Sequence, residues 1–462
     1  MTNQISRKRL PVSLSLMAIA SITALSALVG CSNAPELLER AAMPTAPAFN
    51  ASALFALSDA DMAGTGYADK LLRKVPGQRD ALTRVLPSAA RDDTSNSVFA
   101  SNSVTGWPGP MDIGPACRMA YVAETRSEAP AGVQKLENPY TGLPEGKLVS
   151  AFDLSGTGAP VAAGSIIVSG NPKSVHVAPN GRWLIAPLEK AGSELGFVIL
   201  EGGRPTQVRY AKLDTAAYHT AEFVRGPQFA RINPRGDVIA LNLGNTHVAF
   251  VRVGFDSTGL PSGAELIGQP VPAGKWISMG RWSADGRFYI TADTGWGPGD
   301  LDAVFNGPGA LRSIAFQPDG AHKAVSTALL SLSPEGFDVD PAGKLILAVN
   351  MERTYLPEAL PFALFGRRDR ASLSLVTFDP ASGALATVDG PLAFKGVLPE
   401  HALFDRDGTG IATAVYHEKS DIPQAGWVEY FHIDRSGVAP RIVPTGRRQP
   451  VPRGAHALAV CY

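Results

Sequence analysis

The sequence is poor in cysteine, in charged residues and in the short motifs that mark common enzyme classes. Its 462 residues include 3 cysteines, and 42 lysines and arginines balance 42 aspartates and glutamates. This balance gives no reason to expect a nucleic acid as a partner. No GxSxG, HExxH, CxxCH or Walker sequence occurs, so serine hydrolase, zinc protease, c-type haem and nucleotide chemistry are disfavoured.

The first 30 residues indicate a signal peptide, because a basic start (Arg7–Arg9) precedes an apolar stretch at Leu14–Ala27. Leu28 to Cys31 read LVGC and resemble the lipobox of bacterial lipoproteins. The resemblance implies cleavage before Cys31 and its acylation, with the lipid as the only membrane contact; an ordinary signal peptide with a chance cysteine is the alternative. Ser32 follows instead of an aspartate, which favours the outer membrane, facing the periplasm. Loss of three cations leaves a formal net charge of −3.

Two regions follow the signal peptide (residues 1–30). Residues 31–106 are expected to form a lipidated tether and an N-terminal segment, because alanine, proline and serine dominate Ser32–Ser58. Residues 107–462 are expected to form the folded domain. A content of 45% hydrophobic residues, with 47 glycines and 37 prolines, indicates a globular chain that is rich in turns.

One short phrase recurs through the folded domain: an apolar strand, a tight turn that ends in glycine, and a second apolar strand. The clearest copies are Val175–Pro187, Ala230–Asn242, Gly280–Asp293, Phe337–Asn350 and Ala402–Val415. Their turn glycines are 50–65 residues apart, which is typical of a stacked or radial β repeat. Two further copies, Pro108–Ala123 and Pro452–Tyr462, carry Cys117 and Cys461 in place of the glycine.

These repeats predict an all-β fold, a β-propeller with four-stranded antiparallel blades around a channel. Seven blades are expected, with six as the alternative. The ring would close by pairing the C-terminal strand with N-terminal segments such as Ala81–Leu86 and Asn96–Val104. Closure would bring the first and last copies side by side, so we expect a disulfide between Cys117 and Cys461 in an oxidising compartment.

Position within the repeat predicts which side chains line the channel. The set five residues before the turn is mostly ionisable: Asp112, His176, Arg231, Arg281, Asp338, Leu403 and His456. A second polar set, eight residues before the turn, is expected at the channel mouth: Lys173, Gln228, Ser278, Glu335, Glu400 and Arg453. Buried charges need partners or water, and a channel can supply both. Trp107, Trp276, Trp282 and Trp296 are expected to pack between blades.

The turns PNGRWL, PRGDVI and PAGKLIL, with FDPASGAL between them, resemble the YVTN/lactonase-like β-propellers over about residues 107–462. That group includes lactonases, a muconate cycloisomerase and members without known chemistry. The resemblance implies opening or closing of a lactone ring by His, Glu and Arg side chains in the channel. His176 or His456 would move the proton. On the closed ring Arg231, Arg281 and Asp338 would face His456, Asp112 and His176. The two arginines would bind a substrate carboxylate and stabilise an oxyanion. The substrate would be bound by five residues of the second polar set: Lys173, Gln228, Glu335, Glu400 and Arg453.

Three alternatives to catalysis are open at this point. The channel set could form a salt-bridged structural plug. Asp112, His176 and His456 could bind a divalent metal, with Asp338 or water completing the shell; no other cofactor is expected. The domain could also be a non-catalytic scaffold or ligand-binding module, with a small molecule or an envelope protein as its partner.

Overall fold

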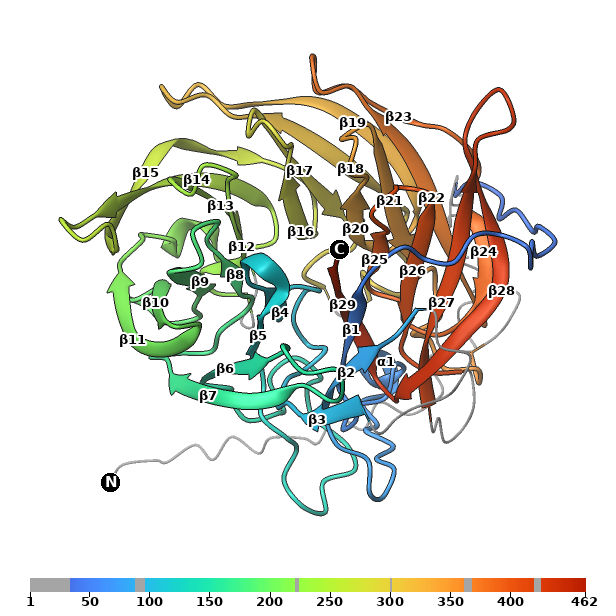
Figure 1. The fold of residues 1–462 in the computed structure, drawn as a ribbon, viewed down its shortest axis with the longest axis horizontal. Coiled ribbons are helices and arrows are strands. Elements are labelled where there is room, and N and C mark those ends of the chain that lie inside the picture. The colour runs from blue at the N-terminus through green and yellow to red at the C-terminus, as the bar shows by residue number, and fades with distance from the viewer. Residues whose placement is uncertain (1–33, 88–95, 221–223, 300, 361–367, 419–424) are drawn as a thin grey trace, which may run out of the picture. The chain divides into compact units, whose positions relative to one another are not determined.

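The computed structural model describes residues 34–87, 96–220, 224–299, 301–360, 368–418 and 425–462, so the predicted signal peptide and the predicted lipidation site Cys31 lie outside the described residues. Seven antiparallel sheets stand in a ring around a central axis (Figure 1). Six of these sheets have four strands, and one has five. The prediction of a seven-bladed β-propeller is confirmed, and the six-bladed alternative is excluded.

Blades 1 to 4 follow one another along the chain, and each runs outward from an inner strand at the channel. Blade 1 contains β4 (Met111–Ile113), β5 (Met119–Ala123), β6 (Leu148–Asp153) and β7 (Val161–Ile167), and blade 2 contains β8 (His176–Val177), β9 (Trp183–Pro187), β10 (Leu195–Glu201) and β11 (Arg204–Ala211). Blade 3 contains β12 (Pro227–Ile232), β13 (Val238–Leu243), β14 (His247–Phe255) and β15 (Pro261–Pro272), and blade 4 contains β16 (Ile277–Trp282), β17 (Phe288–Asp293), β18 (Pro308–Ala315) and β19 (Lys323–Leu332).

Blades 5 to 7 complete the ring. Blade 5 contains β20 (Pro334–Val339), β21 (Leu345–Asn350), β22 (Arg370–Phe378) and β23 (Leu385–Thr387), with β24 (Leu392–Lys395) also paired to β22. Blade 6 contains β25 (Ala402–Phe404), β26 (Gly410–Val415), β27 (Ala425–Asp434) and β28 (Arg441–Pro452). Blade 7 contains β29 (Ala455–Cys461), β1 (Ala53–Ser58), β2 (Ala81–Val85) and β3 (Ser97–Phe99). Short helical turns are α1 (Gly66–Asp69), η4 (Pro115–Cys117) and η5 (Ala216–Tyr218).

Blade 7 joins the two ends of the chain. Its inner strand β29 pairs with β1, which places Leu54 opposite Val460. The expectation that Ala81–Leu86 and Asn96–Val104 contribute to the seventh blade is confirmed by β2 and β3, although β29 itself pairs with β1. Strand β1 comes from the stretch expected to be a flexible tether, and all six of its residues are buried. The propeller therefore begins before residue 107.

The Cys117–Cys461 disulfide is present and links η4 of blade 1 to β29 of blade 7, with the two Cα atoms 5.7 Å apart. Both cysteines stand where the other copies have the turn glycine, as the repeat register predicts. Gly181 has φ +67° in its turn, and Cys117 has φ +54° in the equivalent place. Because this left-handed backbone is strained for a residue with a side chain, the disulfide helps to hold it.

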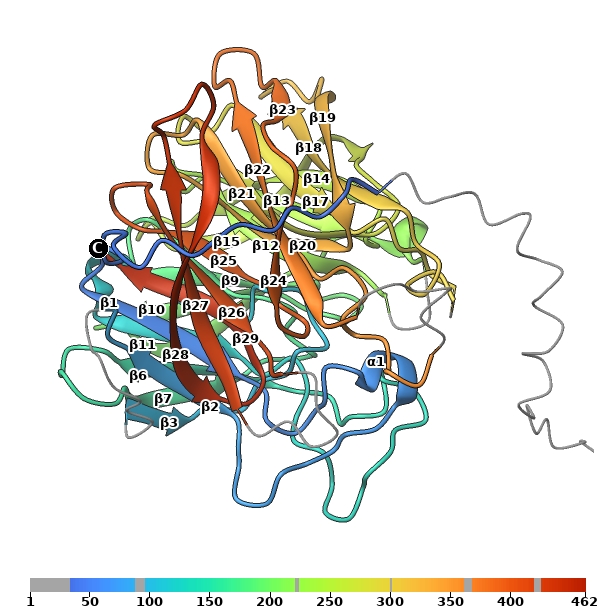
Figure 2. The same ribbon diagram turned by 90° about the vertical axis from the view of Figure 1, so that its right-hand side faces the viewer.

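The segment before β1 lies across the outer edges of two blades (Figure 2). Leu38 pairs in parallel with Leu392 of β24, and Arg40 donates to the carbonyl of Ile442 in β28. The residues from Leu38 onward are therefore bound to the propeller and do not form the flexible tether that was expected. Within the described ranges, no helix has the length and apolar character needed to cross a membrane.

Candidate active site

The inner strands bring polar residues to two opposite mouths of the channel. Near the start of these strands lies a hollow, here called the aromatic pocket, whose walls include Tyr67, Trp107, Tyr140, Trp276 and Trp296. Near the ends of the same strands lies a wider hollow, the arginine mouth, whose lining includes Asp112, His176, Arg231, Arg281 and Asp338. The residues predicted to share one channel site are thus divided between two places.

Local irregularities in the inner strands turn members of the second polar set, eight residues before the turn, toward the aromatic pocket. Residues three apart on a regular strand face opposite sides, so the two predicted sets should not both face the channel. The inner strands of blades 3 and 5 shift register within Pro227–Phe229 and Pro334–Phe337. Gln228 and Glu335 lie inside these shifts and line the pocket. Each bulge therefore re-aims one side chain without moving the rest of the strand.

Three side chains of the arginine mouth connect neighbouring blades. Each accepts a hydrogen bond from a main-chain N–H group of the next inner strand. The pairs are Asp112 Oδ2 with Val177 N (2.9 Å), His176 Nδ1 with Ile232 N (3.0 Å) and Asp338 Oδ2 with Phe404 N (2.9 Å). We call these side chains the interblade belt. They satisfy buried donors that would otherwise destabilise the fold.

Blade 6 contributes to the belt from a different position. Leu403 stands five residues before the turn and has no acceptor atom, but His401, two residues earlier, accepts the N–H of Leu458 at its Nδ1 (3.0 Å). The belt thus continues into blade 7. These contacts support the structural plug that was kept as an alternative to catalysis.

The protonation of His176 follows from its contacts. Burial, with help from nearby Arg231 and Arg281, holds the pKa of His176 well below 6.5, so the ring is neutral. Nδ1 accepts a main-chain hydrogen bond, so the proton is on Nε2, which lies 3.7 Å from Asp112 Oδ2. A ring nitrogen that is already bonded is not available as a base. The geometry thus gives His176 a place in the belt and does not support the proton transfer expected of it.

The two arginines of this mouth differ in their partners. Arg281 donates from Nε to the carbonyl of Phe337 (3.0 Å), and its Nη2 lies 3.3 Å from Asp338 Oδ1. Arg231 forms no side-chain hydrogen bond or ion pair within the described part of the chain. The expectation that both would bind one substrate carboxylate therefore has support from Arg231 alone.

His456 lies deeper, on the side of the aromatic pocket. Its Nε2 lies 2.8 Å from Asn102 Oδ1. The Asn102 amide nitrogen donates to the carbonyls of Ser58 and Ala100, which leaves its oxygen to accept. The proton of His456 is therefore on Nε2 and the lone pair on Nδ1. Burial lowers the pKa of His456 to about 3, so the ring stays neutral.

That lone pair faces a carboxyl group. His456 Nδ1 lies 3.7 Å from Glu400 Oε2, and both side chains are 1% exposed. Neither atom has a hydrogen-bond partner among the described residues. Burial, together with the charges of Glu335 and Asp59, raises the pKa of Glu400 well above its usual value. Glu400 is thus disposed to carry a proton, with an unoccupied acceptor beside it.

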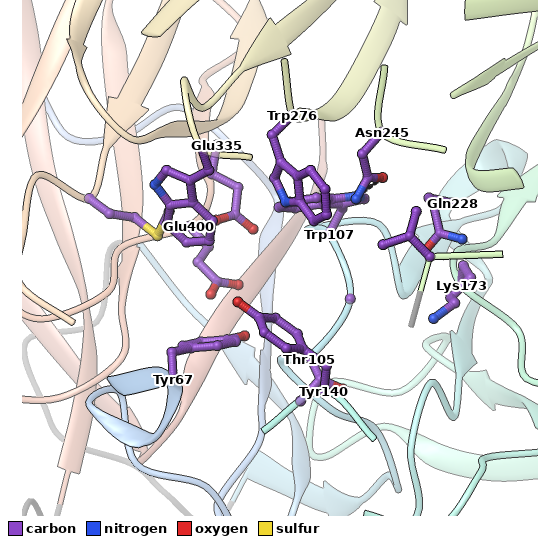
Figure 3. A pocket seen from close by; sticks show the side chains of 14 residues that line it. Tyr67, Thr105, Trp107, Tyr140, Lys173, Gln228, Asn245, Trp276, Glu335 and Glu400 are labelled. Carbon is purple, nitrogen blue, oxygen red and sulfur yellow. Dashed lines mark hydrogen bonds between the residues drawn. The ribbon is translucent and has the colours of Figure 1, made fainter. Parts of the chain in front are cut away.

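The aromatic pocket has a cavity volume of about 40 Å³ and about 560 Å³ of space outside its atoms, with the open solvent at its mouth included. Glu335 and Glu400 extend into it beside the hydroxyls of Tyr67 and Tyr140 (Figure 3). The indole N–H of Trp107 is bonded to Asn245 Oδ1 (3.1 Å). Contrary to the expectation from sequence, Trp107, Trp276 and Trp296 line this pocket, whereas Trp282 does pack between blades.

The electrostatics of the pocket are dominated by its two carboxyl groups. Burial raises the pKa of Glu335 and of Glu400, and the charge of Glu335 further disfavours ionisation of Glu400. Lys173 is the cation in the lining, but its Nζ lies 2.9 Å from Glu189 Oε2. Gln228 donates from Nε2 to the carbonyl of Arg225 (3.1 Å). Two neighbouring carboxyls that share protons are a known arrangement for general acid and base catalysis.

Four of the five residues predicted to bind substrate line this pocket: Lys173, Gln228, Glu335 and Glu400. Arg453, the fifth, is outside the lining and fully buried. Its Nη2 donates to the carbonyls of Met62 and Leu72, at 2.7 and 2.8 Å. Arg453 therefore holds the N-terminal segment against blade 7. The sequence did not reveal this role, because the carbonyls it binds are about 380 residues away in the chain.

The structure does not gather the predicted metal ligands. Asp112 and His176 are bonded to main-chain groups, and His456 is bonded to Asn102. Within the described residues, Asp59, Asp61 and Asp80 are the one group whose ligand atoms all lie within 4.8 Å of one another. Main-chain N–H groups already bind these carboxylates. A metal bound by Asp112, His176 and His456 stays a prediction without preorganised ligands.

The fold and the pocket together define a class of protein: a seven-bladed β-propeller with a pocket of aromatic and carboxyl side chains at the start of its inner strands. No protein-family model and no curated protein sequence matches this chain.

Solved structures do share the fold. The periplasmic gluconolactonase of Pseudomonas aeruginosa matches with a TM-score of 0.57 and 15% identity, over 88% of this chain and 99% of that chain. A putative 6-phosphogluconolactonase of Bacteroides uniformis matches with a TM-score of 0.56 and 13% identity, over 89% and 99% of the two chains. A putative 6-phosphogluconolactonase of Bacteroides fragilis matches with a TM-score of 0.54 and 14% identity, over 88% of this chain and 98% of that chain. The structural neighbours are thus lactonase-like propellers, and at these identities the likeness shows the fold.

Proposed function

We propose that this protein hydrolyses an uncharged lactone of a sugar-like ring in the aromatic pocket. The observation that carries the proposal is the pair Glu335 and Glu400, two buried carboxyls with raised pKa values in a hollow with aromatic walls. The fold shared with a gluconolactonase adds support at the level of architecture. Aromatic faces bind the apolar faces of a ring, and the pocket amides bind its hydroxyls.

In the proposed hydrolysis one carboxyl group acts as the general base and the other as the general acid. In this mechanism Glu335 is the ionised group and Glu400 the protonated one, because burial and the charge of Glu335 both raise the pKa of Glu400. Glu335 takes a proton from a water molecule, whose oxygen adds to the lactone carbonyl carbon. As the ring C–O bond breaks, Glu400 gives its proton to the leaving ring oxygen. The product is the open hydroxy acid, and the proton gained by Glu335 restores the starting state on return to Glu400.

His456 acts as a positioning residue for Glu400. Its unprotonated Nδ1 lies 3.7 Å from Glu400 Oε2, and its Nε2 is fixed by Asn102. When Glu400 moves to hydrogen-bond distance, the lone pair on Nδ1 accepts its proton in a hydrogen bond and orients the carboxyl group. His456 thus keeps part of the proton-handling role expected from the sequence, although it acts through a carboxyl group.

The charge of the pocket favours an uncharged substrate over a phosphorylated one. No arginine lines it among the described residues, and Lys173 is paired with Glu189. A phosphate group would face two carboxyls without a free cation to bind it. The proposal therefore follows the gluconolactonase type of substrate, not the phosphorylated type.

We place the protein in the bacterial envelope, lipid-anchored through Cys31 and facing the periplasm. The signal sequence and the LVGC segment support this location. The Cys117–Cys461 disulfide is consistent with an oxidising compartment.

Hydrolysis of two substrates tests the proposal. Initial rates above the spontaneous rate should be measured for glucono-1,5-lactone and for 6-phosphogluconolactone, with and without a chelator. Turnover of the uncharged lactone, lost in Glu335→Gln and kept in the matched surface variant Glu265→Gln, is the expected result. Glu265 forms an ion pair with Arg252 on the surface, and 79% of its side chain is exposed. No turnover of either lactone would refute the proposal and favour a binding or scaffolding propeller.

A further inference from the structure

Arg231 is the exception in the arginine mouth. The other ionisable side chains of that lining have partners: Asp112, His176 and Asp338 bind the main chain of the next blade, and Arg281 pairs with Asp338. The guanidinium of Arg231 forms neither a hydrogen bond nor an ion pair within the described chain. A partly buried cation without a partner is costly, so its presence calls for a ligand.

The nearest carboxylates do not supply that ligand. Asp112 and Asp338 both attract Arg231 electrostatically. Yet the Oδ2 atoms of both accept main-chain N–H groups, and Asp338 Oδ1 faces Arg281. Moving either carboxylate onto Arg231 would break a connection between two blades. The desolvation of Arg231 is seen in its pKa, which burial lowers to about 10.

Several donors face the same hollow. Arg231 and Arg281 come from equivalent positions of adjacent blades, and the proton of His176 is on Nε2, in the same lining. The arginine mouth has a cavity volume of about 570 Å³, which is enough for a small organic anion with its water. Arginine forks match the paired oxygens of carboxylate and phosphate groups.

We propose that the arginine mouth is a second binding site, which takes the oxyanion group of a small carboxylate or phosphate compound at the guanidinium of Arg231. It lies at the opposite end of the inner strands from the aromatic pocket and shares no lining residue with it. The site does not depend on lactone hydrolysis. The ligand neutralises Arg231 and leaves the interblade belt intact.

Calorimetric titration of the full exported protein tests this site. Succinate and inorganic phosphate are titrated separately at constant ionic strength, with chloride as the control anion. Succinate, phosphate or both should bind, and Arg231→Gln should weaken that binding at least about tenfold. Arg235→Gln is the matched control, since Arg235 lies beyond the same strand and has 66% of its side chain exposed; binding should not change. Binding of succinate alone identifies a carboxylate site, and binding of phosphate alone identifies a phosphate site.

Three results would overturn the proposal: no heat from either anion, equal binding of chloride, or equal affinity in Arg231→Gln. If Arg231→Gln does not fold, as judged by its melting temperature, Arg231→Lys replaces it, because lysine keeps the charge but loses the fork. Affinity should still fall, and unchanged affinity would count against the site. Lactone turnover is followed in parallel, so failure of the proposed function can be told apart from failure of this site.

Discussion

The two mouths of the channel are built from the same inner strands, but their polar residues have different partners. At the arginine mouth, Asp112, His176 and Asp338 each bind an N–H group of the next blade. At the aromatic pocket, Glu400 Oε2 has no hydrogen-bond partner among the described residues and lies beside the lone pair of His456. Polar groups with partners hold the ring together, whereas buried groups without partners are available for chemistry.

This difference shows that an ionisable side chain in a channel is not evidence of a reaction until its partners are known. Both sets occupy recurring positions of one repeat, and both are polar. The set with more ionisable members turned out to be mainly structural. The set at the start of the strands, expected only to bind substrate, contains the stronger candidates for catalysis.

A pair of matched substitutions, one at each mouth, should give the largest effect. Glu400→Gln should lower lactone turnover by about 1,000-fold, because general acid–base groups contribute on that scale, whereas Asp338→Asn should leave the turnover of folded protein within about threefold. Initial rates on glucono-1,5-lactone measure both. Similar losses in the two variants would show that the mouths act as one site.

Removal of the Cys117–Cys461 disulfide tests whether the arginine-mouth end of the inner strands has a structural role. The Cys117→Ser, Cys461→Ser double variant should lose about 3 kcal/mol of unfolding free energy, because the bond closes a loop of 344 residues between blades 1 and 7. Denaturant melts measure this loss. Turnover of the folded variant should persist, and a stability change below about 0.5 kcal/mol would contradict a closing role.

Truncation of a belt residue should cost somewhat less. Asp338→Ala leaves the Phe404 N–H and Arg281 without their partner, so we expect a loss of about 2 kcal/mol. The surface variant Asp214→Ala serves as the control and should change stability by less than about 0.5 kcal/mol. Equal stability of the two variants would remove the case for the belt.

The smallest expected effect is on pH dependence. The pKa of His176 is depressed in the folded protein. Below pH 6.5 the unfolded chain therefore binds a proton at His176 that the folded protein does not bind. The free energy of unfolding falls as the pH falls. His176→Gln, whose amide oxygen can still accept the Ile232 N–H, should flatten this slope by at most about 1.4 kcal/mol per pH unit. Denaturant melts between pH 4.5 and 7 measure it, with exposed His219→Gln as the control. An unchanged slope would mean that His176 is protonated in the fold.

Much of the fold could be predicted from the sequence because the repeat is local. The turn glycine, the apolar strands and the cysteines at the turn position recur in register, and so the blades and the disulfide followed. Strand β1 could not be predicted, because ALFALS becomes a strand only between β29 and β2. The aromatic walls were missed for a similar reason, since Trp107 and Trp296 lie in loops whose course no local pattern specifies.

The sequence by itself determined the propeller repeat, the residues at each strand position and the pairing of Cys117 with Cys461, because each depends on a period that neighbouring residues establish. The tertiary structure decided in favour of seven blades over six. Only the tertiary structure decided which polar residues keep a free donor or acceptor. That outcome depends on bulges at Gln228 and Glu335 and on partners hundreds of residues away, as with Asn102 and His456. A hydrogen bond is satisfied in space, and its partner can come from any part of the chain.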